Sequence, residues 1–237
     1  MEKNDRLIIA LDLDSGEKAL EIVRGLKDEV RFFKVGLELF SSAGPEIIGK
    51  IREAGCEIFL DLKFHDIPAT VAKAAVAIVK YGSFMFNVHA LGGYDMMKKA
   101  ADEAKRESER LKVRCPKILA VTILTSMDEN GLKKAGIDVS IEKEVLSLAG
   151  LAKDAGLDGV VASPKEAALI RKSFGREFLI VTPGVRPAWA ASNDQKRIAT
   201  PAEAMKAGSD FIVVGRPVTE APDPVQAARD ILKEIEV

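Results

Sequence analysis

Short apolar runs alternate along the whole chain with longer segments in which apolar residues recur every three or four positions. The short runs, rich in Val, Ile, Leu and Phe, predict buried strands, and the longer Ala-, Lys- and Glu-rich segments predict amphipathic helices. Eight strands are expected, each followed by a helix. The predicted strands span residues 6–13, 31–36, 57–63, 84–90, 117–124, 158–163, 178–184 and 211–217. The predicted helices span residues 16–28, 45–55, 67–82, 93–112, 141–156, 164–175, 200–208 and 223–235.

Strands that are apolar on both faces are typical of a parallel sheet covered by helices. Eight strand–helix units in 237 residues predict an α/β fold, a (β/α)8 TIM barrel formed as a single catalytic domain by residues 1–237. An open, doubly wound parallel sheet is the structural alternative. Glycines stand where predicted helices end, as expected for C-terminal caps, at Gly55, Gly82, Gly156, Gly175 and Gly208.

The overall charge argues against polyanionic partners. The chain has 35 basic and 36 acidic residues and a formal net charge of −1, so no strong field attracts nucleic acid or an anionic membrane. No uncharged stretch reaches the roughly 18 residues of a membrane span. We therefore expect neither nucleic acid nor a membrane as a partner, and any anionic ligand needs a local site.

The N-terminus and the cysteines predict a cytoplasmic protein. The apolar run from Leu7 to Leu11 is followed by Asp12, which is too short a run for the core of a signal peptide. The two cysteines, Cys56 and Cys115, form neither a CxxC pair nor a disulfide framework, which is typical of a reducing compartment. We expect both to be buried or half-buried thiols.

The segment "FLDLKFHDIP", residues 59–68, places three charges in an otherwise mostly apolar strand region. Side chains alternate between the two faces of a strand, so Phe59, Asp61 and Lys63 share one face. In a barrel this face points toward the axis. Active sites of such barrels lie at the carboxyl ends of the strands, where Asp61 and Lys63 stand.

The same alternation identifies the last inward residues of other strands, which are Asp12, Lys34, Asn87 and His89. We expect Asp12, Lys34, Asp61 and Lys63 to converge at one rim. A single Asp–Lys pair could be a structural ion pair, but burying charges costs several kcal/mol per ion even when they are paired. Four such charges favour a preorganised electrostatic site. His89 could equally be a packing residue.

Two regions near the C-terminus predict a site for a phosphorylated substrate. A polar connection near residues 184–199 is longer than most loops and is a candidate lid. It carries Arg186, Trp189, Gln195, Lys196 and Arg197. After the eighth strand, Gly215 lets a ligand approach the backbone, and Arg216 offers two donors to a phosphate. Loops after the seventh and eighth strands commonly bind phosphate in these barrels.

The segment "FLDLKFHDIPATV" resembles the signature of the orotidine 5'-phosphate decarboxylase family, D-x-K-x-x-D-I-P-x-T. Further segments follow in the order typical of that family: "ALDLD", "FKVG", "AVTILTSM", "TPGVRP" and "VVGRP". The resemblance covers essentially the whole chain, and its central motif is specific.

The resemblance implies a catalytic network and a homodimer. An alternating charge network would consist of Lys34, Asp61, Lys63 and Asp66, with Lys63 as the proton donor. The second aspartate of the motif acts across a dimer interface in that family. Asp66, Ile67 and Thr70 would therefore complete the neighbouring subunit's site.

The resemblance also implies which residues hold the substrate. Asp12 would contact the ribose, and Thr125 would contact the pyrimidine. The phosphate would be held by Gln195, Gly215 and Arg216, with Arg186 on the closing loop.

The implied reaction converts orotidine 5'-phosphate to uridine 5'-phosphate and CO₂ in de novo pyrimidine biosynthesis, without a metal or an organic cofactor. One alternative is a magnesium-dependent decarboxylase or aldolase of sugar phosphates, which can share the D-x-K-x-x-D strand. The complete H-D-I-P-x-T continuation and the long loop argue against it. The other is a barrel that binds nucleotides without catalysis, although a pure binder does not need a lysine flanked by carboxylates.

Overall fold

A closed ring of eight parallel strands forms the centre of the computed structural model, which describes residues 5–190 and 199–235. The strands are β1 (Leu7–Ala10), β2 (Phe32–Gly36), β3 (Glu57–Phe64), β4 (Met85–His89), β5 (Lys117–Val121), β6 (Gly159–Val161), β7 (Leu179–Thr182) and β8 (Phe211–Val214). Each strand pairs with the next, and β8 pairs with β1. The predicted (β/α)8 barrel is confirmed, and the open doubly wound sheet is excluded.

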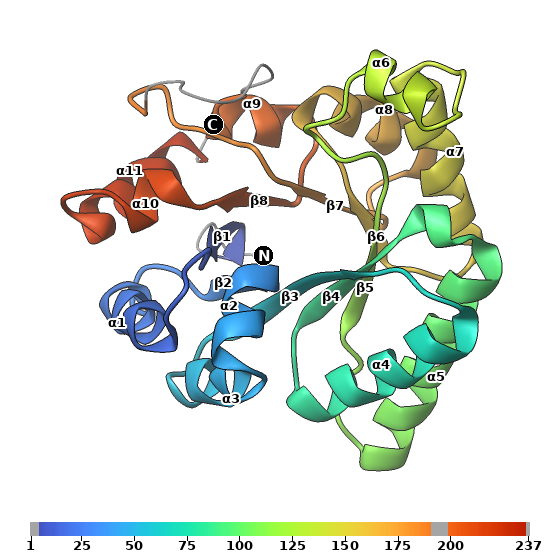
Figure 1. Cartoon of the computed structure of the whole chain (residues 1–237). Coiled ribbons are helices and arrows are strands. Elements are labelled where there is room, and N and C mark those ends of the chain that lie inside the picture. The colour runs from blue at the N-terminus through green and yellow to red at the C-terminus, as the bar shows by residue number, and fades with distance from the viewer. Residues whose placement is uncertain (1–4, 191–198, 236–237) are drawn as a thin grey trace.

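Eight helices follow the strands at the positions that the apolar periodicity predicts, and they surround the barrel (Figure 1). They are α1 (Gly16–Leu26), α3 (Glu46–Glu53), α4 (Pro68–Tyr81), α5 (Tyr94–Leu111), α7 (Ile141–Asp154), α8 (Pro164–Phe174), α9 (Pro201–Lys206) and α11 (Pro224–Glu234). The glycines predicted at helix ends all have positive φ, between 69° and 106°. Glycine adopts this conformation without steric cost, so these residues end the helices as expected.

Within the described residues, four short helical segments occur where none was predicted, and all of them lie at the carboxyl ends of strands. They are α2 (Leu37–Ala43), the 3₁₀ turn η2 (Ala90–Gly92), α6 (Glu129–Lys134) and α10 (Arg216–Thr219). Segments of two turns or fewer are too short to give a clear periodic pattern. Because they follow β2, β4, β5 and β8, they shape the rim on which barrel active sites are built.

The core has two layers that follow the alternation of the strands. Inside the barrel, a cluster that includes Phe32, Phe59 and Phe211 fills the axis. Between the strands and the helices, a larger cluster includes Phe33 and Leu60, which alternate with the inward residues. The interior is thus packed with side chains rather than open. Asp61 and Lys63 lie beyond this cluster, at the carboxyl end of β3, where they line a cavity.

The structure also bears on the expected lack of a membrane span and on the two cysteines. Among residues 5–190 and 199–235, no helix has the length and apolar character needed to cross a membrane. Cys56 is buried, as predicted, but Cys115 is exposed, so the expectation of a shielded thiol was wrong for Cys115. It lies in the connection between α5 and β5, outside any element with an apolar face.

Candidate active site

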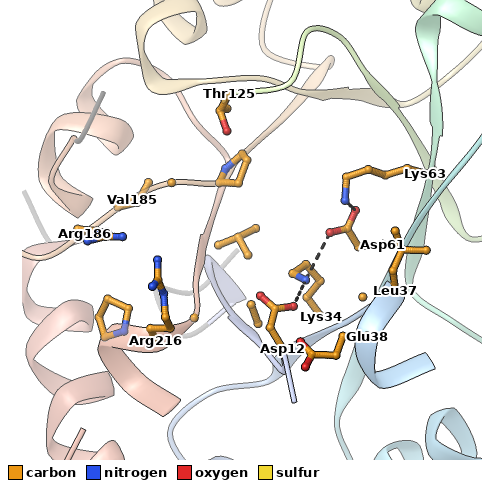
Figure 2. A pocket seen from close by; sticks show the side chains of 17 residues that line it. Asp12, Lys34, Leu37, Glu38, Asp61, Lys63, Thr125, Val185, Arg186 and Arg216 are labelled. Atoms are coloured by element: carbon orange, nitrogen blue, oxygen red, sulfur yellow. Dashed lines mark hydrogen bonds and ion pairs between the residues drawn. The ribbon is translucent and has the colours of Figure 1, made fainter. Parts of the chain in front are cut away.

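Four charged side chains from three neighbouring strand ends form a chain of alternating sign (Figure 2). Lys63 Nζ lies 2.7 Å from Asp61 Oδ1, and Lys34 Nζ lies 3.4 Å from Asp61 Oδ2. Lys34 Nζ also donates a hydrogen bond of 2.8 Å to Asp12 Oδ1. The structure therefore brings together the four residues whose convergence the strand alternation predicts, in the order Asp12, Lys34, Asp61, Lys63.

The Asp61 carboxylate is the centre of this chain. Asp61 and Lys34 are each only 8% exposed. Burial by itself raises the pKa of Asp61, but the ammonium groups of Lys34 and Lys63 and hydrogen bonds from Lys63 and Asn87 lower it. The net result is a pKa below the usual range of an aspartate. The carboxylate is therefore held ionised at neutral pH.

Asn87 joins the two charged residues of β3. Its side chain is fully buried, its Nδ2 donates to Asp61 Oδ1 at 2.6 Å, and its Oδ1 accepts from the Lys63 backbone N–H at 2.8 Å. Strand alternation placed Asn87 on the inward face but gave it no role. The sequence could not show this role, because the partners of Asn87 lie on another strand, 24 and 26 residues away along the chain.

Gly36 is a second residue that the sequence left without a role. A Cβ at this position would lie 2.8 Å from Lys34 Nζ and 3.2 Å from Asp12 Oδ1. Side chains essentially never approach a Cβ as closely as the first distance, so glycine makes room for the Lys34–Asp12 hydrogen bond. The only hint in the sequence was its place two residues after Lys34, at the end of the strand.

The charge chain borders a cavity of about 430 Å³, within the range of small-molecule sites. Arg186 and Arg216 lie on the side of the cavity opposite Asp61 and Lys63 (Figure 2). The lining residues are Ala10, Asp12, Lys34, Gly36, Leu37, Glu38, Asp61, Lys63, Thr125, Pro183, Gly184, Val185, Arg186, Val213, Gly215, Arg216 and Pro217. One wall is therefore the mixed-charge network, and the wall after β7 and β8 carries two guanidinium groups.

The candidate lid is described only at its ends. The Arg186 backbone N–H donates to the carbonyl of Ala199 at 3.0 Å, which joins the two described ends. Trp189 is half exposed and lines a shallower hollow beside Arg186 and Arg216. The remaining candidates of this loop, Gln195, Lys196 and Arg197, lie outside the described residues.

Asp66, Ile67 and Thr70 do not line the cavity of their own chain within the described residues. All three are exposed, in the turn after β3 and the first turn of α4. Asp66 Oδ1 accepts a hydrogen bond of 2.6 Å from the Ile67 backbone N–H, and Ile67 is 66% exposed. The structure thus separates these three residues from the other predicted site residues of the same chain.

His89 lies beside the network and pairs with the only other histidine of the sequence. The rings of His65 and His89 are 5.6 Å apart. Burial lowers the pKa of His89, the charges of His65 and Lys63 lower it further, and Asp61 opposes them. His89 is therefore neutral at pH 7, where it adds no charge next to Lys63.

Comparison with known proteins shows the family to which the chain belongs. The sequence model of the orotidine 5'-phosphate decarboxylase / HUMPS family matches residues 5–231. The chain belongs to this family. The resemblance that the motifs indicated is therefore confirmed over almost the full length of the chain.

Individual members of the family are similar in sequence and in structure. A protein of Syntrophotalea carbinolica named orotidine 5'-phosphate decarboxylase is 54% identical over 99% of this chain and 96% of its own length. One of Geobacter sulfurreducens with the same name is 51% identical, over 99% and 97%. The crystal structure of orotidine 5'-phosphate decarboxylase from Lactobacillus acidophilus matches with a TM-score of 0.87 at 44% identity, covering 98% of this chain and all of that one.

Proposed function

We propose that this chain is an orotidine 5'-phosphate decarboxylase, which converts orotidine 5'-phosphate to uridine 5'-phosphate and CO₂ in de novo pyrimidine biosynthesis. The family and the names of its similar members support the activity. The observation that carries the proposal is a buried carboxylate held between two ammonium groups, facing two arginines across one cavity.

The two walls of the cavity match the two ends of the nucleotide. We assign the phosphate to Gly215 and Arg216 with Arg186, and to Gln195 from the lid. Guanidinium groups bind phosphate oxygens through paired, charge-assisted hydrogen bonds. The reacting pyrimidine then lies toward Asp61 and Lys63.

The middle of the nucleotide is assigned to residues between these walls. Asp12 would contact the ribose, because carboxylate oxygens accept hydrogen bonds from sugar hydroxyls. Lys34, which is hydrogen-bonded to Asp12, would donate to oxygens of the same sugar. Thr125, which lines the cavity from the connection after β5, would contact the pyrimidine ring.

The chemical step needs charge stabilisation followed by proton transfer. When the bond between C6 and the carboxylate breaks, CO₂ leaves and the electron pair stays on C6, in an orbital that the ring cannot readily delocalise. The Lys63 ammonium would stabilise this anion and then donate a proton to C6, leaving a neutral amine that is reprotonated from water. No organic cofactor or metal is required by these steps.

The rest of the network would orient Lys63 and act on the substrate carboxylate. Asp61 would lie near that carboxylate, where the repulsion between the like charges falls as CO₂ leaves. Lys34 fixes the opposite side of Asp61, and Asp66 of a second subunit would complete the alternation. Binding of the distant phosphate would hold the pyrimidine against these charges, so that its binding energy contributes to the transition state.

We further propose that the enzyme is a homodimer in which Asp66, Ile67 and Thr70 complete the neighbouring subunit's site. Two observations support this. These residues are exposed beside the cavity rather than lining it. Large apolar side chains are also exposed in the connections after β2, β3, β4 and β5, at Leu37, Ile67, Leu91, Tyr94 and Leu124. Such exposed apolar side chains are typical of surfaces that a partner covers. An enzyme that sediments as a monomer while fully active would contradict the dimer.

Domain extent, cellular location and the lack of polyanionic partners are also proposals. We propose one catalytic domain over residues 1–237 and a cytoplasmic location without nucleic-acid or membrane partners. The closed ring from β1 to β8 supports the single domain, and the near-zero net charge supports the lack of polyanionic partners.

The decisive experiment follows the loss of orotidine 5'-phosphate absorbance with the purified chain in excess chelator. We expect turnover that the chelator does not change. Chelator-sensitive turnover of a sugar phosphate, without turnover of orotidine 5'-phosphate, would favour the magnesium-dependent alternative. Tight binding of uridine 5'-phosphate without any turnover would favour a nucleotide-binding protein without catalysis.

A further inference from the structure

The strand that carries the catalytic charges is irregular where they stand. β3 and β4 pair regularly up to Leu60 and Phe86, and they pair again at Phe64 and Val88. Residues 61–63 of β3 therefore lie opposite the single residue Asn87. Such a bulge bends a strand and re-aims its side chains, and bulges are common next to active sites.

Lys63 adopts an uncommon backbone conformation within this bulge. Its φ is +52°, in the left-handed region that residues other than glycine rarely occupy. The bulge takes the Lys63 N–H out of the regular β3–β4 ladder, and this N–H donates instead to the side-chain oxygen of Asn87 at 2.8 Å. The asparagine amide thus replaces a strand–strand hydrogen bond and fixes the position of Lys63.

The other end of the same amide fixes Asp61. Asn87 Nδ2 donates to the Oδ1 atom that also accepts from Lys63 Nζ, at 2.6 and 2.7 Å. Asn87 is fully buried, so neither of its contacts can be replaced freely by water. A neutral donor also stabilises the carboxylate without adding a third positive charge to those of Lys34 and Lys63.

We propose that Asn87 is a positioning residue of the active site: its amide locks the Lys63 backbone and the Asp61 carboxylate into one geometry. The proposal rests on the proposed decarboxylase function and adds to it a residue that touches neither the substrate nor the transferred proton. It follows from the bulge, the positive φ and the two hydrogen bonds taken together.

Two substitutions separate the two ends of the amide. Asn87→Leu is similar in size and removes both hydrogen bonds. Asn87→Asp keeps an acceptor for the Lys63 N–H but replaces the donor to Asp61 with a second carboxylate. Neither substitution removes any of the other groups that face Asp61, which are Lys34 with Asp12 behind it, Lys63, and the pair of His89 and His65.

The test measures kcat, KM and the pH profile of kcat/KM for orotidine 5'-phosphate, together with thermal unfolding. Misplacement of catalytic groups by about 1 Å can cost about 100-fold in rate, so we expect kcat of both variants to fall about 10- to 100-fold with little change in KM. The acidic limb of kcat/KM should move to higher pH in both variants, because the Asp61 carboxylate loses its donor. The shift should be larger in Asn87→Asp, because the new carboxylate also repels that of Asp61.

Thr182→Val is the matched control. Thr182 is also fully buried on a barrel strand and shares a hydrogen bond of 2.6 Å with Ser209, but it alternates with the inward residue Val181 and so faces the helices. We expect this variant to lose thermal stability while keeping the wild-type kcat and acidic limb. If Asn87→Leu fails to fold, Asn87→Asp, which preserves the shape of the side chain, provides the same measurement.

The outcomes separate this inference from the proposed function. A wild-type enzyme without decarboxylase activity would overturn the function itself. An active wild type with Asn87 variants of unchanged kcat would overturn only the role of Asn87. A loss of kcat that accompanies lower thermal stability, without movement of the acidic limb, would show that Asn87 is merely structural and would also overturn the proposal.

Discussion

The Lys63 ammonium donates a hydrogen bond of 2.7 Å to the carboxylate of Asp61, two residues earlier on the same strand. This pair faces the cavity, and it is joined on the far side of the carboxylate by Lys34. The ammonium is thereby held in one orientation before any substrate arrives. Preorganised charge of this kind is the main means by which enzymes stabilise a developing anion.

The first prediction concerns Lys63→Ala. If Lys63 is the proton donor and the charge beside C6, as proposed, its removal should lower kcat at least about 1,000-fold, because each effect alone is worth roughly 100-fold or more. Binding of uridine 5'-phosphate, followed by calorimetry, should remain measurable because the proposed phosphate site at Arg186 and Arg216 is intact. Lys117→Ala is the control, since Lys117 pairs with Asp158 at 2.7 Å at the opposite end of the barrel. Near wild-type turnover by Lys63→Ala would refute the assigned mechanism.

The second prediction concerns pH and the stability of Asp61→Asn. At pH 7 the variant should be less stable by roughly 3–5 kcal/mol, because the ammonium groups of Lys34 and Lys63 lose their shared counter-charge. The pKa of Asp61 is lowered in the folded protein. Its contribution is therefore complete above the ordinary aspartate pKa of about 4, and it is lost as the pH falls through the folded value.

Urea unfolding at a series of pH values measures this effect. The difference in the free energy of unfolding between wild type and Asp61→Asn should narrow below about pH 4. Asp102→Asn is the control, because Asp102 forms an exposed pair with Lys98, and such pairs contribute little to stability. A difference that stays constant or widens toward acid would contradict the assigned role of the Asp61 charge.

The third prediction concerns Arg216→Ala and the phosphate. Hydrogen bonds to charged groups contribute about 1.5–3 kcal/mol, so kcat/KM for orotidine 5'-phosphate should fall about 10- to 150-fold. The slow turnover of orotidine, which has no phosphate, should not change. Arg229→Ala is the control, since Arg229 pairs with Glu29 at the surface. Equal losses on both substrates would place Arg216 away from the phosphate.

The fourth prediction concerns Gly36→Ala. The added Cβ would displace the Lys34 ammonium, which can move because it ends a flexible side chain. We expect thermal stability close to wild type but kcat/KM lower by about tenfold, as is typical of a small misplacement at a catalytic site. Gly49→Ala is the control, because a Cβ there would meet no described atom within 4 Å apart from its chain neighbours and the backbone of its own helix. Unchanged kinetics of Gly36→Ala would show that the Lys34–Asp12 contact does not matter for the reaction.

The sequence alone predicted the barrel and the convergence of the charges for one physical reason. Alternation along a strand is set by the backbone, so the inward position of Phe59 predicts that of Asp61 without knowledge of the rest of the chain. Lys63 also lines the cavity, as predicted, but it does so within the bulge. The order of strand–helix units then places Asp12 and Lys34 on neighbouring strands, because consecutive strands of such a barrel are adjacent.

Other features depend on contacts between distant segments and could not be predicted in this way. The bulge at Lys63 and its hydrogen bond to Asn87 arise from the pairing of two strands, and the need for Gly36 arises from the reach of a lysine side chain. Leu37 is apolar and received no role from the sequence. Only the folded chain shows that it stays exposed at the rim.

The last prediction tests whether two subunits share one site. Lys63→Ala and Asp66→Ala should each be nearly inactive alone, because every site of each homodimer lacks one member of the network. In a mixed dimer, one site carries both defects, while the other combines an intact Lys63 with the partner's intact Asp66. Random exchange at equal concentrations should therefore restore about one quarter of the wild-type activity.

The control mixes Lys63→Ala with Asp61→Ala under the same conditions. Lys63 and Asp61 belong to the same wall of one cavity, so every mixed dimer has two defective sites and no activity should return. If neither mixture regains activity although mass spectrometry shows that subunits exchange, Asp66 acts within its own chain or not at all. Recovery in the first mixture alone would make the exposed turn after β3 part of the neighbouring active site.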